Sequence, residues 1–194
     1  IDNFVATLPP EQVPELLDAL LELEAREKYG RFGALFPDVG DLRREMYVKH
    51  LEFFKVGDNY RERCFMAGNR VGKTIAGSYE VTCHLTGLYP HWWTGRKFPA
   101  PIRAWAAGKT NETTRDIIQL ELLGNISFES QRKIVDGTGI IPKDLLGVGP
   151  GEISWKAGVA DLVDTIRVRH RTGGWSELGL KSYQQGRGSF EGTA

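Results

Sequence analysis

The sequence predicts an α/β fold in which a mostly parallel sheet is flanked by helices. A strand-like run, a glycine-containing loop and a helical pattern follow one another over residues 61–85, and a second strand-then-helix pattern covers residues 102–123. Residues 165–183 alternate in the manner of a β-hairpin. Repeated strand–helix units build parallel sheets whose ligands bind at the carboxyl ends of the strands. With 194 residues, 41% of them hydrophobic, the chain can bury a sizeable core.

The composition excludes several classes of protein. The 25 Lys and Arg residues balance the 25 Asp and Glu residues, so a histone-like protein is excluded and a charged partner must meet a local patch. No apolar run approaches the roughly 20 residues of a membrane span, no signal peptide opens the chain, and two cysteines make no disulfide framework. We therefore expect a cytosolic protein without membrane contact. A first residue other than Met and an end within a glycine-rich run predict a piece of a longer protein.

Residues 1–60 are expected to form a helical segment that braces the main body. Thr7, followed by two prolines, begins an acidic helical pattern with leucines at three- and four-residue spacing that ends near Gly30. A second helix is expected over residues 42–55, with Tyr47 and Phe54 on one face, and closes at a turn over residues 57–59.

Residues 61–194 are expected to form the α/β core. A strand over residues 61–67 leads into the glycine loop and then into a helix from Lys73 to about Leu85. The second strand covers residues 102–107, and Thr110 or Asn111 caps the helix that follows it. A C-terminal β-hairpin turns at residues 172–174.

The loop before the first core helix fits the phosphate-binding pattern, with alanine in the first glycine position: Ala67-Gly68-Asn69-Arg70-Val71-Gly72-Lys73-Thr74. A triphosphate at a helix N-terminus needs backbone N–H groups pointed at it, so Gly68 and Gly72 are expected in left-handed turns. Lys73 would reach the β- and γ-phosphates, and the Thr74 hydroxyl would bind the bridging Mg²⁺. The sequence thus predicts a P-loop NTPase core with a nucleotide site at these eight residues.

Two features near this pattern have alternative interpretations. Arg70, inside the loop, could stabilise charge in a phosphoryl-transfer transition state, or tether the loop to a neighbouring acid. A second Gly-Lys-Thr at residues 108–110 lacks the preceding glycine and follows a strand directly. It is a strand end with a helix cap, or Lys109 contacts a nucleic-acid phosphate.

Aromatic and basic residues elsewhere raise the question of nucleic-acid binding. Trp92 and Trp93, beside several cationic side chains, could stack on bases or pack against their own domain. Arg167, Arg169 and Arg171 alternate along a strand, so they could follow a DNA backbone or form a solvated face. The four histidines and two cysteines have no metal-ligand spacing, so nucleotide magnesium is the metal expected.

The loop and its flanks resemble a known family. The run Glu62-Arg63-Cys64-Phe65-Met66-Ala67-Gly68-Asn69-Arg70-Val71-Gly72-Lys73-Thr74, with Tyr47-Val48-Lys49-His50-Leu51-Glu52-Phe53-Phe54 ahead of it, resembles the ATPase domain of the large terminase subunit of tailed bacteriophages, headful-packaging type. The likeness continues through Glu80, Trp105 and Ser182-Tyr183-Gln184-Gln185-Gly186-Arg187, and covers most of the chain.

The resemblance implies a motor that hydrolyses ATP with Mg²⁺ and translocates double-stranded DNA, without reading its sequence, into a procapsid. It implies a ring on the portal protein, the small terminase subunit as a further partner, and action in the host bacterial cytoplasm without retention in the mature virion. In the family an acidic strand that holds magnesium follows a stretch matching residues 186–192, so the chain is expected to stop just before it. We expect nucleotide binding with weak or no hydrolysis by this chain alone.

The resemblance also assigns roles to individual residues. Lys73 and Thr74 keep the roles given above, Arg70 corresponds to the family's loop arginine, and Arg187 to an arginine that acts on a neighbouring subunit's ATP. Tyr47 and His50 belong to the adenine-side segment, although histidine replaces the usual glutamine there and cannot offer its paired donor and acceptor. Asp136 and Asp164 follow too little apolar strand to be the missing acid.

Two other functions stay open from the sequence. The chain is alternatively a non-catalytic docking or assembly fragment, or part of another DNA-dependent P-loop ATPase related to helicases. Residues after Ala194 would distinguish these alternatives, because an apolar strand ending in Asp-Glu favours the motor.

Overall fold

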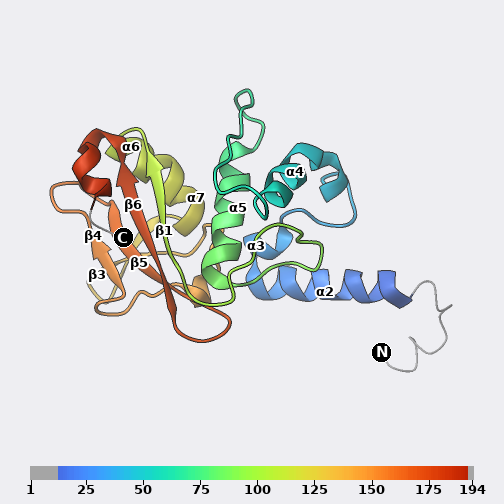
Figure 1. The fold of residues 1–194 in the computed structure, drawn as a ribbon. Helices are drawn as coiled ribbons and strands as arrows, with labels where there is room; N and C mark the ends of the chain where they lie inside the picture. The colour runs from blue at the N-terminus through green and yellow to red at the C-terminus, as the bar shows by residue number, and fades with distance from the viewer. Residues whose placement is uncertain (1–12, 192–194) are drawn as a thin grey trace. The chain divides into compact units, whose positions relative to one another are not determined.

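The computed structural model describes residues 13–191 and divides the chain into two compact units, Ile1–Glu52 and Phe53–Ala194 (Figure 1). The predicted cap at Thr7 lies outside the described residues. The helices of the first part of the chain are α2 (Val13–Tyr29), α3 (Arg31–Ala34), a 3₁₀ turn (Arg44–Tyr47) and α4 (Val48–Val56), which crosses from one unit into the other.

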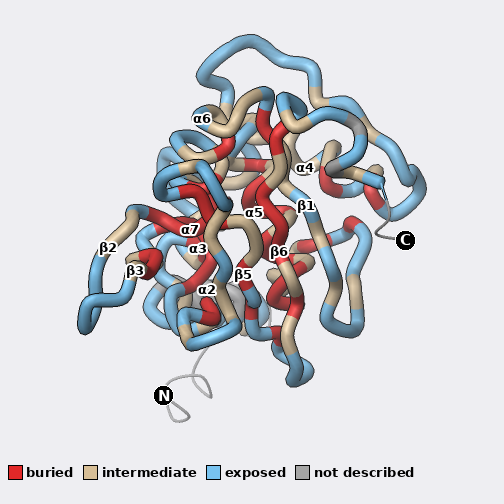
Figure 2. The backbone as a smooth tube through the Cα atoms, turned by 90° about the vertical axis from the view of Figure 1, so that its left-hand side faces the viewer, coloured by how far each residue is buried: buried red, intermediate tan, exposed pale blue. Residues whose placement is uncertain are grey.

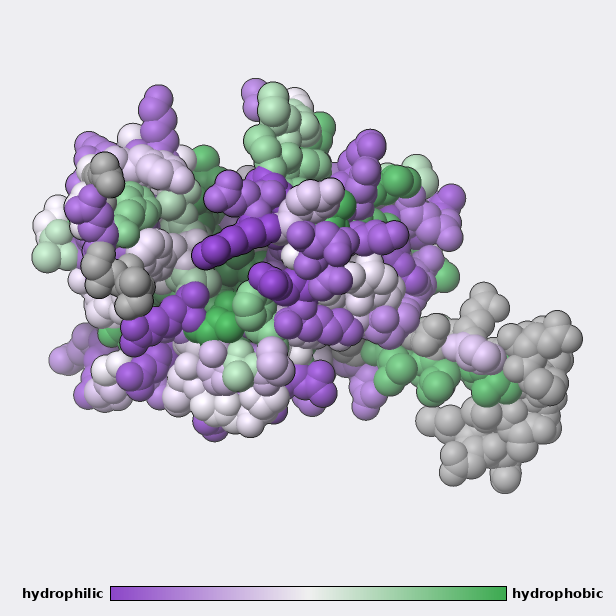
Figure 3. Space-filling model, viewed as in Figure 1, coloured by the Kyte–Doolittle hydropathy of each residue, from purple (hydrophilic) through white to green (hydrophobic). Residues whose placement is uncertain are grey.

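The first unit follows the predicted helical pattern. α2 ends at Tyr29, one residue before Gly30, whose φ of +55° suits glycine. Phe32 and Phe36 are buried in this unit, whereas apolar side chains of α2 are exposed (Figure 3). The exposed leucines of α2 are Leu17, Leu20, Leu21 and Leu23. The predicted second helix begins as the 3₁₀ turn and becomes α-helical only at Val48.

The second unit contains α5 (Lys73–Thr86) and a four-stranded sheet of order β1-β6-β5-β4. β1 and β6 run parallel, but β6 with β5 and β5 with β4 run antiparallel. The prediction of a mostly parallel sheet is therefore only partly confirmed, because the tight turn that joins β5 to β6 forces antiparallel pairing of these two strands. The strands are β1 (Arg103–Gly108), β4 (Ile153–Trp155), β5 (Val163–Arg169) and β6 (Trp175–Ser182).

The strand predicted over residues 61–67 is absent: this run forms no strand with any residue that the structure describes. An apolar side chain of the run packs on α4 instead, because the Phe65 ring stacks on Phe53 with centroids 4.8 Å apart. A strand requires a neighbouring backbone as well as the right side chains. The other predicted strands and α5 are confirmed within one or two residues.

The core of the second unit lies between the sheet and two helices. Side chains of α5 and α7 (Leu120–Leu123) pack with the inward residues of β5 and β6, and these segments carry much of the buried backbone in Figure 2. α6 (Asn111–Thr113), a π-helical segment (Thr114–Gln119) and α7 form one continuous helix after β1. A separate hairpin pairs β2 (Ile126–Glu129) with β3 (Arg132–Val135). Among the described residues, no helix has the length and apolar character to cross a membrane.

Candidate nucleotide site

The predicted phosphate-binding loop joins the run of residues 61–67 to the first turn of α5. Gly72 is the N-cap of α5 with φ +80° and ψ +15°, so its backbone is left-handed as predicted. Lys73 is the first residue of the helix, and its Nζ donates to the carbonyl oxygen of Ala67 at 2.8 Å and also to that of Gly68. The lysine ammonium is therefore held inside the curve of the loop.

The loop meets the requirements of an anion site. α5 is a 14-residue helix without an acidic side chain in its first turn, so its N-terminal N–H groups and its dipole favour negative charge. Gly72 and Lys73 are partly buried, whereas the other loop residues are exposed: Ala67, Gly68, Asn69, Arg70, Val71 and Thr74. A phosphate chain approaching from solvent would meet these groups directly.

One detail of the predicted loop geometry is wrong. Gly68 has no positive φ, and the second left-handed residue of the loop is Arg70, with φ +62°. A non-glycine residue pays a steric cost in this region, so Arg70 is held there by the loop around it. Arg70 is exposed and forms no ion pair with any acid of the described residues, which leaves the tether interpretation without a partner.

The predicted adenine-side residues belong to the first unit. Tyr47 and His50 pack edge-on at 5.5 Å, and the Phe36 ring lies 5.6 Å from Tyr47 and 6.3 Å from His50. The loop lies in the second unit, so a shared site of Tyr47 and His50 with the loop stays a prediction. The backbone of Arg187 lies in a short 3₁₀ helix (Arg187–Phe190), and its action on a neighbouring subunit also stays a prediction.

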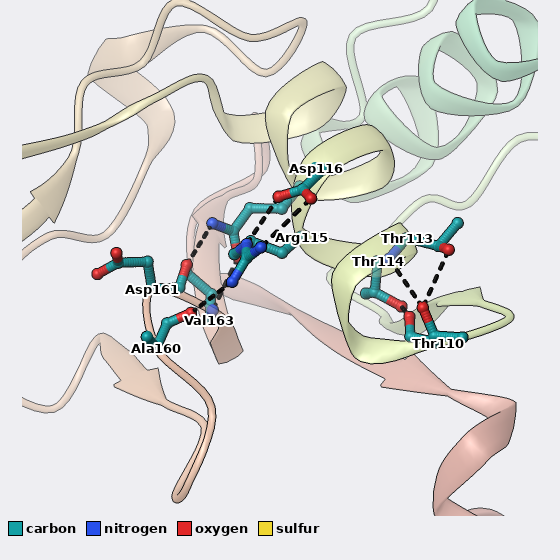
Figure 4. Close-up of polar contacts among 9 residues, drawn as sticks. Thr110, Thr113, Thr114, Arg115, Asp116, Ala160, Asp161 and Val163 are labelled. Atoms are coloured by element: carbon teal, nitrogen blue, oxygen red, sulfur yellow. Dashed lines mark hydrogen bonds and ion pairs between the residues drawn. The ribbon is translucent and has the colours of Figure 1, made fainter.

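The second Gly-Lys-Thr forms a strand end and a helix cap. Gly108 is the last residue of β1, and the Thr110 side chain accepts a hydrogen bond from the Thr113 N–H at 3.1 Å (Figure 4). A Cβ on Gly108 would lie 2.6 Å from the Thr114 hydroxyl, so the chain has no room there for a phosphate loop. Lys109 is exposed, and its contact with a nucleic-acid phosphate stays open.

The two aspartates considered as alternative acids have structural partners. Asp136 Oδ1 accepts hydrogen bonds from the backbone N–H of Asn125 and of Thr138, each at 2.9 Å, and closes a turn. Asp164 pairs with Lys156 Nζ at 2.9 Å. No cluster of three or more His, Cys, Asp or Glu side chains in residues 13–191 is arranged to hold a metal ion.

The paired tryptophans and the arginines of β5 have different environments. Trp93 is 3% exposed and stacks on Phe54 at 5.0 Å, and Trp92 lies parallel to Tyr79 at 6.1 Å, so both tryptophans pack within the second unit. On the sheet face away from α5, Arg167 and Arg169 are exposed, whereas Arg171 lies beyond the end of β5.

That outward face also carries residues from the neighbouring strands. Arg103 and Arg167 lie on either side of Glu177, and Arg169 lies over the Trp175 ring at 5.0 Å. The Lys181 ammonium lies 5.7 Å from the centre of the Trp105 ring. Pairing with Trp105, Trp175 and Glu177 orders these cations on a surface that sequence spacing attributed to β5 alone.

Sequence reasoning missed a buried ion pair beside the loop. Arg63 Nη1 donates to Glu80 Oε1 at 2.9 Å, and the two side chains are 20% and 7% exposed. The available signal was an acid on the buried face of a helix, where a charge requires a partner.

Comparison with known proteins finds a matching family and a relative. The profile of the family described as "Terminase large subunit, T4likevirus-type, N-terminal" matches residues 64–194. The chain is 35% identical over 211 aligned residues to the protein "Terminase, large subunit" of Salmonella phage P22, and the match covers 99% of this chain and 38% of that protein. No solved structure matches. The chain therefore belongs to the terminase large subunit family.

Proposed function

We propose that this chain is the ATP-binding part of a phage DNA-packaging motor, with the P-loop NTPase core formed by the second unit. The observation that supports this proposal is the Lys73 ammonium directed into a loop that ends at the left-handed N-cap of α5. The family supports a role in DNA packaging, and the chain spans 38% of the length of its P22 relative.

Lys73 and the helix N-terminus would hold the triphosphate. To do so, the ammonium exchanges the two loop carbonyl oxygens for phosphate oxygens, which are charged and therefore stronger acceptors. Thr74 would hold Mg²⁺, which when bound neutralises charge on the β- and γ-phosphates. Arg70, exposed beside Lys73, would act on charge that develops during transfer.

Double-stranded DNA, the portal protein, the small terminase subunit and further copies of the chain in a ring are the proposed partners. The basic outward face of the sheet, with Arg103 and Arg167 on either side of Glu177 and Arg169 over Trp175, supports contact with a phosphate backbone. Such contacts carry no base information, so binding would be independent of sequence. Action in the host cytoplasm follows from the same proposal.

The first test is a titration of Mg-ATP into the chain and into its Lys73→Ala variant. We expect saturable binding by the parent and an affinity about 10²-fold or more lower for the variant, because two charge-assisted hydrogen bonds to phosphate are removed. Lys109→Ala is the matched control, since it removes the lysine of the other Gly-Lys-Thr and should bind as the parent does. Equal affinity of the parent and Lys73→Ala would refute the site.

A further inference from the structure

The Arg63 side chain is a point where three segments of the second unit meet. Its Nη1 donates to Glu80 Oε1 on α5 at 2.9 Å and to the carbonyl oxygen of Phe53 at 2.7 Å. The guanidinium also lies 4.5 Å from the centre of the Phe53 ring. Gly57 provides the space, because a Cβ there would lie 2.7 Å from Arg63 Nη1. The end of α4, the run before the loop and α5 are thereby joined.

Glu80 also lies close to a histidine of its own helix. His84, one turn further along α5, places Nε2 3.6 Å from the same carboxylate oxygen. The other ring nitrogen of His84 lies 3.0 Å from the Tyr89 hydroxyl, which accepts a hydrogen bond from the Phe98 N–H at 2.8 Å. The Glu80 carboxylate therefore neighbours both the Arg63 guanidinium and the His84 imidazole.

The run before the loop depends on side chains for its position. Residues 61–67 have no strand pairing with the described residues, so no backbone ladder sets their register against the rest of the unit. The run contacts α5 near its beginning, where Arg63 donates to Glu80, and at its end, where the carbonyl oxygens of Ala67 and the adjoining Gly68 accept from Lys73.

The spacing of these contacts allows α5 to hold the run at both of its ends. Lys73 and Glu80 are seven residues apart, which is about two helical turns and about 10 Å along the axis, so their side chains leave the same face of α5. Arg63 and Ala67 are four residues apart, and four residues of chain can span up to roughly 14 Å. The run can therefore lie along α5 with one contact at each end.

We propose that Glu80 is a positioning residue for the phosphate-binding loop: through Arg63 it fixes the register of residues 63–67 against α5 and so the position of the loop carbonyls around Lys73. The functional part rests on nucleotide binding at this loop. A buried ion pair can often be replaced by apolar side chains without loss of stability, so its geometry, rather than its energy, is what the loop requires.

The test compares three variants of the whole chain. Glu80→Gln removes the charge at constant size, and the double variant Arg63→Met with Glu80→Leu replaces the pair by apolar side chains that need no partner. Asp164→Asn, which breaks the Lys156 ion pair on β5, is the control for losing an ion pair far from the loop. The readouts are thermal melting, Mg-ATP affinity and the rate of chymotrypsin cleavage after Phe65, in the middle of the run.

We expect the double variant to melt near the parent temperature yet to bind Mg-ATP about tenfold more weakly, the loss typical when a group that orients a ligand-contacting residue is removed. Cleavage by chymotrypsin after Phe65, whose ring stacks on Phe53, should become faster in both Glu80 variants and stay unchanged in Asp164→Asn. Parent-like affinity and cleavage rate in a folded double variant would overturn the proposal.

The two proposals fail in different ways. If Lys73→Ala loses binding while the Glu80 variants match the parent in affinity and in cleavage after Phe65, the nucleotide site stands and the positioning role is wrong. If the parent binds no Mg-ATP, the proposed function fails, and the cleavage rate alone decides whether Glu80 holds the run: an unchanged rate overturns the positioning role.

Discussion

Replacing Gly72 with alanine should destabilise the chain, whereas the same replacement at Gly77, five residues along α5, should stabilise it. Gly72 has φ +80°, where a Cβ costs about 1–2 kcal/mol because it approaches the following carbonyl oxygen. Gly77 lies inside α5, and a Cβ there meets nothing within 4 Å outside the helix's own backbone. Alanine at an open helix position contributes about 0.5–1 kcal/mol relative to glycine.

The two variants should thus differ in unfolding free energy by about 1.5–3 kcal/mol, with opposite signs relative to the parent. Urea denaturation followed by tryptophan fluorescence measures both values, with the slope of each transition compared to show that the unfolding reaction is the same. A titration with Mg-ATP gives the second readout. Gly72→Ala should weaken binding, since the loop N–H groups move, while Gly77→Ala should leave the affinity unchanged.

A stabilised Gly72→Ala would refute this reasoning. It would mean that residue 72 adopts ordinary helical dihedrals, that α5 begins earlier in the chain, and that no left-handed N-cap presents the N–H groups to an anion. A destabilised Gly77→Ala would point to a neighbour packed against α5 at that position, and the expected difference between the variants would then vanish.

Two further predictions concern pH and DNA. Burial lowers the pKa of His170, which is 2% exposed, so as the pH falls this histidine is protonated in the unfolded chain before it is protonated in the folded chain. The contribution of His170 to stability should therefore be full above about pH 6.5 and decline below it. His170→Gln should remove this part of the decline in urea midpoints measured between pH 7.5 and 5.5. For DNA, removing Arg167 and Arg169 together should lower the salt dependence of duplex binding by about 0.9 in log–log slope per lost phosphate contact, measured by fluorescence anisotropy, while Arg132→Ala on β3 should have no effect. Equal slopes for the double variant and the parent would remove the sheet face from the DNA-binding surface.

Elements whose signals are local could be predicted from the sequence. α5 has a glycine at each end, Gly72 and Gly87, both left-handed, and Thr110 caps the next helix with its own side chain. The β5–β6 hairpin has Gly173 and Gly174 at its turn, with φ +90° and +78°. These residues carry their conformational preference with them, so the pattern is enough.

Elements that depend on distant segments or on unusual turn residues could not be predicted from the sequence. The β2–β3 hairpin turns at Ser130 and Gln131 with φ +48° and +65°, so the Asn-Gly or Asp-Gly signal of a two-residue turn is missing. β4 has three residues, too few to show a period. The mixed direction of the sheet and the lack of a ladder for residues 61–67 are set by pairing between distant segments, which one sequence does not display.

The same limit applies to the candidate site: the residues of the loop could be predicted, but the contacts between distant residues that hold the loop in place could not. The pattern identified Lys73 and Gly72, but the contact of Arg63 with Glu80 joins residues 17 apart. An acid in mid-helix is commonly solvated. It required a partner here only because that face of α5 is buried, a fact that appears once the neighbouring segments are in place.

The two Gly-Lys-Thr sequences show why the surrounding backbone, rather than the three residues, decides the chemistry. At residues 72–74 the glycine is left-handed at the N-cap of a long helix, the lysine turns into the loop, and the threonine is exposed. At residues 108–110 the glycine ends a strand against Thr114, and the threonine side chain already accepts the Thr113 N–H. A hydroxyl that caps its own helix is committed to that backbone. Only the first sequence therefore combines a lysine ammonium directed into a loop, an exposed threonine and the N-terminus of a long helix, which are the features expected for binding a magnesium-bound triphosphate.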